Sequence, residues 1–262
     1  PLEGKYGLMR SDGTLVAPVR FTAVLWAVDG VAAMRDGEQT QLYNIATAQA
    51  IGEPYEDVGA YAQGFVPVKK DGLWAYLNPV TGNVLGEGFV WETALPFSQG
   101  LAAVSREGQY GYIGTDGQTA IALQYAGAAA FSEGLAGIRV GNRWGFIDRK
   151  GNQTIKPAYA GVKTFQQGLC AVRKGEQWGL INTAGEVILR LKYSEIGDFD
   201  PVTHRAWFRQ NKLWGLISAG GNVVMKPTWS AHDEFAGNTL CRVAYRTEYA
   251  YVDASGKTRI SG

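Results

Sequence analysis

The chain has 262 residues, of which 46% are hydrophobic, and its 25 basic and 24 acidic residues leave a formal net charge of +1. This composition is typical of a globular protein with a buried core, and the balanced charge without a Lys/Arg cluster argues against nucleic acid or anionic lipid as a partner. No apolar run reaches the roughly 20 residues that a membrane-spanning helix needs, so we expect no membrane span.

Three columns of residues recur along the chain every 34 to 36 positions. The Trp-Gly column is aromatic in all copies but one and comprises Tyr6, Thr40, Trp74, Tyr110, Trp144, Trp178, Trp214 and Tyr249. The second column comprises Phe21, Tyr55, Trp91, Tyr125, Tyr159, Tyr193 and Trp229. The third comprises Ala27, Tyr61, Phe97, Phe131, Phe165, Phe199 and Phe235. We therefore predict a single β domain over residues 1–262, made of seven tandem units of about 35 residues with an additional Trp-Gly-type segment at one end.

Each unit is predicted to contain three short strands joined by tight turns. Residues 168–175 (GLCAVRKG) form one strand that ends in a turn, and residues 177–189 (QWGLINTAGEVIL) contain a second strand, a Gly turn and the start of a third. The triplets SDG, TDG and RKG place Gly where a turn needs positive φ, and VAPVR and IKPAY place Pro at a strand end. No helical period is present. We expect the residues of all three columns to be buried and to pack one unit on the next.

The motif that recurs resembles the repeat of bacterial WG-repeat proteins. It reads F-x-x-G-L-A-x-V, then W-G-x-I-[DN]-x-x-G, then P-x-Y, with the best copies over Phe131–Tyr159 and Phe165–Tyr193. Weaker copies extend from Lys5 to about Lys257, and the pattern departs at Thr40-Gln41 and in the copy that contains Trp207. The resemblance implies a soluble bacterial protein from a cell-envelope or multidomain context, with periplasm favoured over cytoplasm, and it implies no specific activity. The start at Pro1, almost inside a repeat, indicates a processed or trimmed N-terminus.

Two architectures fit seven short β units, namely a closed propeller-like ring and an open β-solenoid. A closed array hides its sheet edges, whereas an open one needs polar capping units. Both ends of this chain keep the aromatic motif, as KYGLM and EYAYVDASG, and the chain starts and ends near a Trp-Gly strand. These features favour the ring, while the short length of the unit keeps the solenoid as the alternative.

The sequence predicts no catalytic residue, metal site or cofactor. Cys170 and Cys241 occupy the same position of units two apart, so we expect them to be free, small and buried. His204 and His232 have no neighbouring ligand at metal-binding spacing, and neither a G-x-S-x-G elbow nor a phosphate loop is present. Acidic residues that recur in or beside the turn after the Trp-Gly strand are interpreted as caps of the turn backbone rather than Ca²⁺ ligands; they are Asp12, Asp116, Asp148 and Asp253.

Two tryptophans, Trp26 and Trp207, lie outside the columns. Trp207 stands beside an apparent two-residue insertion, among His204, Arg205 and Arg209, and Trp and Arg are enriched in binding hot spots. These five residues are the candidate binding residues, and the alternative is a diverged repeat with a locally repacked core. We predict a non-catalytic module that binds another protein, as an adaptor or immunity protein does. The alternative is a carbohydrate or cell-wall binder with aromatic platforms, which would need exposed rings in each unit.

Overall fold

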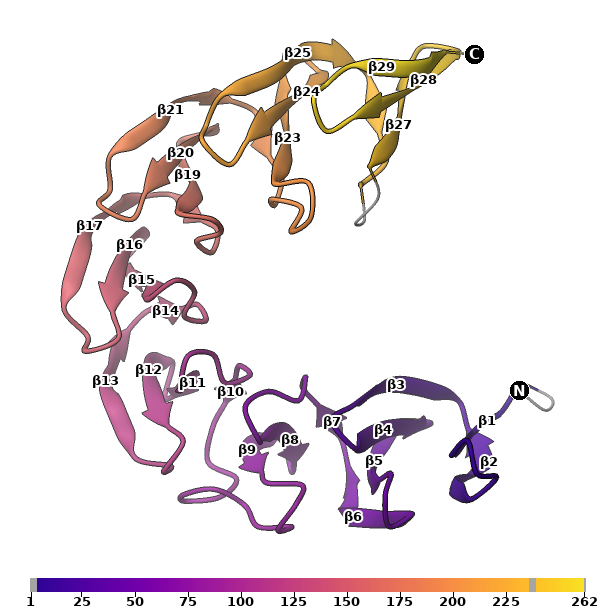
Figure 1. Ribbon diagram of the computed structural model, residues 1–262. Coiled ribbons are helices and arrows are strands. Elements are labelled where there is room, and N and C mark those ends of the chain that lie inside the picture. The colour runs from indigo at the N-terminus through magenta and orange to yellow at the C-terminus, as the bar shows by residue number, and fades with distance from the viewer. Residues whose placement is uncertain (1–3, 236–238, 262) are drawn as a thin grey trace. The chain divides into compact units, whose positions relative to one another are not determined.

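Short antiparallel β-strands make up the fold, and no helix occurs among the residues that the computed structural model describes, 4–235 and 239–261. Each sheet is built from strands that follow one another in the sequence, so neighbours in a sheet are also neighbours along the chain (Figure 1). The chain divides into two compact units, Pro1–Ala130 and Phe131–Gly262. The prediction of an all-β chain of repeated antiparallel sheets is confirmed.

The first unit begins with a two-stranded sheet and continues with sheets of four, three and four strands within the described residues. In chain order its strands are β1 (Tyr6–Met9) and β2 (Leu15–Phe21); β3 (Ala23–Val28), β4 (Val31–Asp36), β5 (Gln39–Asn44) and β6 (Gln49–Tyr55); β7 (Asp57–Val58), β8 (Val66–Lys70) and β9 (Leu73–Leu77); β10 (Thr93–Ala94), β11 (Leu101–Arg106), β12 (Gln109–Gly114) and β13 (Thr119–Tyr125); and β14 (Gly127–Ala128).

The second unit repeats one strand pattern four times. In chain order its strands are β15 (Leu135–Val140), β16 (Arg143–Asp148) and β17 (Gln153–Tyr159); β18 (Gly161–Val162), β19 (Leu169–Lys174), β20 (Gln177–Asn182) and β21 (Val187–Tyr193); β22 (Glu195–Ile196), β23 (Arg205–Gln210), β24 (Leu213–Ser218) and β25 (Val223–Trp229); and β26 (Ala231–His232), β27 (Leu240–Tyr245), β28 (Glu248–Asp253) and β29 (Thr258–Ser261). The last four strands form a sheet of their own.

The three predicted strands are present except in the β1–β2 and β7–β9 sheets, and a further strand, two residues long except at β3, precedes them. In the β18–β21 sheet this strand pairs Gly161 with Arg173 and Val162 with Val172. We did not expect it, because two residues are too few to show the alternation by which a strand is recognised. The number of seven repeats, the single domain and the choice of ring over solenoid stay predictions.

The Gly of the Trp-Gly pair allows the third strand of a sheet to bulge against the second. Trp144 pairs with Tyr159 and Phe146 pairs with Ile155, so that two steps along β16 correspond to four along β17. A Cβ atom on Gly145 would lie 2.5 Å from the Ile155 carbonyl oxygen, closer than real Cβ contacts. Glycine is therefore required because the bulged backbone crosses directly over this residue.

Copies that lack this glycine confirm its role. Where Ala250 stands in its place, it pairs in register with Ser261, and the bulge at this position is absent. At Ala75 the regular third strand is replaced by isolated bridges, such as Trp74 to Trp91. Gln41 keeps the bulge, because Gly52 on the facing strand adopts a φ of 64° and the Gln41 amide donates hydrogen bonds to the Ile51 and Gly52 carbonyl oxygens.

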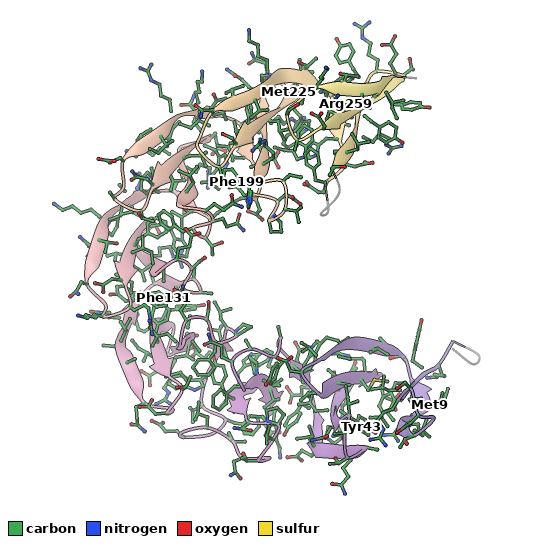
Figure 2. The ribbon with its side chains drawn as sticks, viewed as in Figure 1. Met9, Tyr43, Phe131, Phe199, Met225 and Arg259 are labelled. Carbon is green, nitrogen blue, oxygen red and sulfur yellow. The ribbon has the colours of Figure 1, made fainter. Side chains whose placement is uncertain are left out.

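The core of each unit lies between successive sheets, whose side chains interleave (Figure 2). At the junction of the β15–β17 strands with the β18–β21 sheet, Phe146, Ile155 and Tyr159 of the earlier strands pack on Cys170 and Val172 of the later sheet. The Phe146 ring meets the ring of Phe165, a residue of the third column, edge-on at a centroid distance of 4.9 Å. Residues of both faces of a middle strand are therefore buried, one face against each neighbouring sheet.

The prediction that all three columns are buried is wrong for the Trp-Gly column. The second column is buried from Phe21 to Tyr193, and the third from Phe97 to Phe235. The Trp-Gly column is only half-buried at Trp74, Tyr110, Trp144, Trp178 and Trp214, and Tyr6 and Tyr249 are exposed. The four tryptophans stand near a turn at the end of their sheet, where a paired cation covers each ring. The distances from the cation to the ring centroid are 5.9 Å for Lys69 and Trp74, 5.9 Å for Arg139 and Trp144, 5.8 Å for Arg173 and Trp178, and 5.5 Å for Arg209 and Trp214.

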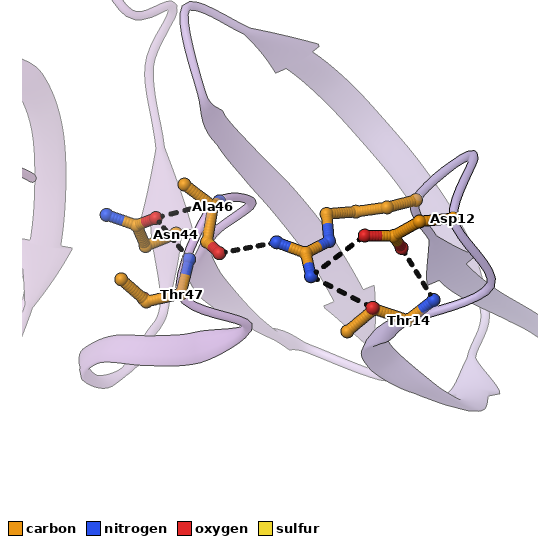
Figure 3. Close-up of polar contacts among 6 residues, drawn as sticks. Asp12, Thr14, Asn44, Ala46 and Thr47 are labelled. Carbon is orange, nitrogen blue, oxygen red and sulfur yellow. Dashed lines mark hydrogen bonds and ion pairs between the residues drawn. The ribbon is translucent and has the colours of Figure 1, made fainter.

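The recurring acidic residues cap turns, as predicted. Asp12 accepts a hydrogen bond of 2.9 Å from the Thr14 backbone N–H, and this bond lowers the pKa of the Asp12 carboxyl. Arg10 then links this turn to the next sheet, because its guanidinium lies 3.2 Å from the Asp12 carboxylate and donates to the Ala46 carbonyl oxygen (Figure 3). Asp116, Asp148 and Asp253 each accept the N–H of the residue two positions later at 2.9 to 3.0 Å.

Both cysteines are free and buried, which confirms the sequence prediction. They occupy equivalent positions on β19 and β27, and burial is the main cause that raises the pKa of the Cys170 and Cys241 thiols to about 12. Because the thiolate is the reactive form, we expect slow reaction of the native protein with a thiol-specific reagent at pH 8, and release of two thiols on denaturation. A rapidly reacting native thiol, or a disulfide between the two seen by mass spectrometry, would contradict this expectation.

Candidate binding groove on the β18–β21 and β22–β25 sheets

Trp207, the central residue of the site predicted from the sequence, lies in the core. It is 3% exposed, and its ring stacks on His232 at a centroid distance of 4.2 Å and on Phe235 at 5.8 Å. The stack joins β23 to the following sheet, and the indole Nε1 is buried with no hydrogen-bond partner among the residues that the structure describes. A protein partner cannot contact this ring without opening the junction, so the geometry agrees with the alternative of a locally repacked repeat.

The other predicted residues are also engaged within the fold. Arg205 donates from Nε to the Ala254 carbonyl oxygen at 2.6 Å, and Arg209 covers the Trp214 ring. His204 is a turn residue with a φ of 56° directly before β23. Trp26 belongs to the first unit, where it is half-buried on β3 against the core of that unit. A binding role for these five residues stays a prediction.

A surface groove lies on the opposite face of β23. It has a volume of about 500 Å³, and its lining residues are Lys192, Tyr193, Phe208, Gln210, Asn211, Leu213, Val223, Lys226 and Pro227. A second hollow of about 290 Å³ adjoins it and shares Lys192, Tyr193, Gln210 and Asn211. The groove is therefore formed by the ends of β21 and β23, the turn after β23, and β25.

The groove exists where a repeated cation is replaced. At the last position of the corresponding strands, Lys174 lies 5.4 Å from the Tyr159 ring centroid, and Arg106 lies 4.6 Å from that of Trp91. Gln210 occupies this position on β23, opposite Tyr193, and it carries no cation. β23 therefore places no cation over Tyr193 as Lys174 and Arg106 do in their own repeats, and Lys192 approaches the ring from the strand of Tyr193 itself, at 5.3 Å.

The floor of the groove is apolar and rigid, and its rim is polar. Phe208 and Tyr193 are 1% and 3% exposed and meet edge-on at a centroid distance of 4.8 Å. Leu213 adds a half-buried aliphatic side chain, while Gln210 and the exposed Asn211 offer amide groups at the rim. Two exposed lysines, Lys192 and Lys226, flank the groove. This combination suits the binding of an extended segment with an apolar side chain, because a small number of polar groups around an apolar hollow fixes orientation.

The titratable side chains that line the larger hollow of the groove are those of Lys192, Tyr193 and Lys226. Among the described residues that line its larger hollow there is no Cys, His, Asp, Glu, Ser or Thr side chain. Within 4–235 and 239–261, no three His, Cys, Asp or Glu side chains gather as a metal site would require. None of the described residues belongs to a helix with the length and apolar character needed to cross a bilayer.

Sequence reasoning missed the groove, although a signal was present. The repeats are recognised by their aromatic positions, whereas the groove depends on the last residue of the second strand. That position holds, in chain order, Asp36, Lys70, Arg106, Val140, Lys174, Gln210 and Tyr245, so the sequence shows a cation in three of seven copies and none at Gln210. The structural effect of this position was not visible, because it depends on whether the side chain there lies over the aromatic ring of the preceding sheet.

Comparison with known proteins supports the repeat assignment. The model of the WG containing repeat matches residues 55–74, 110–144, 144–178 and 178–214. The fold is similar to the crystal structure of the eukaryotic initiation factor, with a TM-score of 0.63 and 12% identity over 97% of this chain and 80% of that one. It is also similar to Kluyveromyces lactis Hsv2p, with a TM-score of 0.50 and 12% identity over 86% of this chain and 89% of that one. Identities this low show the fold alone, and no curated protein matches the chain. The four matched regions carry the same columns and strands described above, and the chain therefore contains WG repeats.

Proposed function

We propose that this chain is a non-catalytic protein-binding module, and that the groove at residues 192–227 contacts the partner. The observation that carries the proposal is the open groove itself, which has a rigid apolar floor and lies at the position where Lys174 and Arg106 cover an aromatic ring in two other repeats. Interfaces place an apolar centre inside a polar rim, and this groove has both. The propeller-like ring of seven repeats, favoured over an open solenoid, remains part of the proposal and is supported by the recurrence of one type of sheet junction within each unit.

The glycan-binding alternative is less well supported. A sugar platform needs an open aromatic face in successive repeats, and Tyr55, Tyr125 and Tyr159 are 4%, 9% and 6% exposed. The half-buried tryptophans do not offer such a face either, since a paired cation lies over the rings of Trp144, Trp178 and Trp214. The described aromatic residues thus act as packing groups.

The proposal is tested by site-specific crosslinking followed by binding measurements. A photo-reactive amino acid at Asn211 should crosslink a partner that the same group at Asn142, in the equivalent turn between β15 and β16, does not. With that partner purified, Leu213→Gln should weaken binding about tenfold, because an apolar anchor is removed. Glutamine already stands at this position in three other repeats, at Gln39, Gln109 and Gln177, so the fold should be unaffected. Equal crosslinking at both turns, or unchanged affinity of Leu213→Gln, would contradict the proposal.

A further inference from the structure

The charges around the groove indicate the chemistry of its occupant more closely than the shape of the groove does. Lys192 and Lys226 are exposed, and no ion pair involving either is found among the described residues. Lys192 is held in place, because its Nζ lies 5.3 Å from the centroid of the Tyr193 ring. Glu176 is the acidic residue that lines the adjoining hollow, and its carboxylate lies 3.4 Å from the Arg173 guanidinium. The groove therefore has an excess of positive charge, although the whole chain carries a formal net charge of only +1.

Some cations elsewhere in the chain are paired within the fold. Arg106 pairs with Glu87 at 2.8 Å, and Lys163 pairs with Asp198 at 2.9 Å. The two lysines at the groove are not paired in this way. An occupant that brings carboxylates to Lys192 and Lys226 would gain two ion pairs without breaking any.

The outer strand beside the groove restricts how the occupant can bind. β25 is the last strand of its sheet, and it contains Pro227, which has no N–H to offer to an added strand. Addition of a partner strand to this edge is therefore disfavoured. The occupant instead contacts the groove with its side chains, and the amides of Gln210 and Asn211 are placed to bind the backbone of the occupant.

From these observations, and resting on the proposed function, we infer that the groove binds an acidic extended peptide segment of a partner protein. One large apolar side chain of the segment lies on Phe208, Leu213 and Tyr193. Flanking Asp or Glu carboxylates contact the ammonium groups of Lys192 and Lys226. An anionic polynucleotide fits less well, because the aromatic floor has no open ring on which a base could stack.

The inference can be tested with three labelled hexapeptides that differ only in their flanking charge. Asp-Glu-Leu-Phe-Glu-Asp, Asn-Gln-Leu-Phe-Gln-Asn and Lys-Arg-Leu-Phe-Arg-Lys are titrated with the full chain by fluorescence anisotropy. The acidic peptide should bind about tenfold more tightly than the neutral one, and the basic peptide more weakly than both. Raising the ionic strength should reduce this difference, since contacts with exposed charges are screened.

Variants then assign the effect to the two lysines. Lys192→Gln and Lys226→Gln should each weaken binding of the acidic peptide about two- to fivefold and leave the neutral peptide unchanged. Lys156→Gln is the matched control, because Lys156 is exposed and precedes Pro157 on β17 as Lys226 precedes Pro227 on β25.

Each outcome supports or overturns the inference. Equal affinities for the acidic and neutral peptides, unchanged binding by both lysine variants, or no binding of any peptide at about 1 mM would overturn it. If affinity is independent of charge while Leu213→Gln still abolishes binding, the preference for acidic segments is wrong and the protein-binding groove stands. If Leu213→Gln and the crosslink at Asn211 have no effect, the proposed function itself fails.

Discussion

Replacing Trp207 by alanine is expected to lower the free energy of unfolding by about 3–5 kcal/mol, the cost of truncating a large buried aromatic side chain. The ring is 3% exposed and stacks on His232 and Phe235 of the following sheet, so its removal opens a cavity at a junction. Urea denaturation followed by far-UV circular dichroism measures the loss. Trp26→Ala is the control, and its loss should be about 1–2 kcal/mol, because Trp26 is only half-buried.

A second substitution separates the packing of this ring from its polarity. Trp207→Phe keeps an aromatic ring for the stack and removes the indole N–H, which is buried and has no acceptor within residues 4–235 and 239–261. An unsatisfied buried donor costs about 1–3 kcal/mol, which offsets much of the lost ring area, so we expect a net change below about 1.5 kcal/mol. If Trp207→Ala were as stable as the wild type, the ring would be a surface residue, and the hot-spot interpretation of β23 would replace the packing one.

Gly145→Ala is expected to destabilise the chain by about 1–3 kcal/mol, as forced overpacking does. The added Cβ would lie 2.5 Å from the Ile155 carbonyl oxygen and 2.6 Å from the Pro157 nitrogen, and both are backbone atoms of the bulged strand. The sign of the effect is informative, because Gly→Ala at an unstrained position usually stabilises by about 0.4–1 kcal/mol through the unfolded state.

The matched control is Gly161→Ala, in the same unit. A Cβ at this position meets the Arg173 Nε at 3.3 Å, and the flexible arginine side chain can move away. We expect the Gly161→Ala protein to be as stable as the wild type or slightly more stable. Stabilisation by Gly145→Ala would show that β17 can withdraw from the bulge, as the third strand does opposite Ala75 and Ala250.

The repeat and its strands could be predicted from the sequence because they depend on order and spacing, which a single chain displays. The columns identified the period, the turn triplets located the hairpins, and the positions of Asp12 and Asp148 identified the caps. The exposure of the Trp-Gly column could not be predicted in this way. A tryptophan at the end of a strand shows the same sequence pattern whether its ring is covered by the next sheet or by an arginine of its own sheet. Arg139 covers Trp144 in the second way.

The candidate site was less accessible to sequence reasoning. An off-column tryptophan indicated either a hot spot or a repacked core, and the structure places Trp207 among core side chains. The groove lies beside Gln210, at a position that is a cation in some repeats and Asp36, Val140 or Tyr245 in others, so the residue type alone does not predict a hollow. Phe208 illustrates the same limit. It occupies on β23 the position of Val172 on β19, and its residue type gives no indication of which neighbouring sheet its ring contacts.

The construction of each sheet from consecutive strands has a consequence for folding. Hydrogen bonds within a sheet join residues that are close in sequence, so the contact order is low for an all-β chain, and the loop-closure entropy of each hairpin is small. Each repeat depends on its immediate neighbours alone, as in a one-dimensional array. Amide hydrogen exchange should therefore be slowest at the inner junctions of a unit and fastest at β1, β2 and β29.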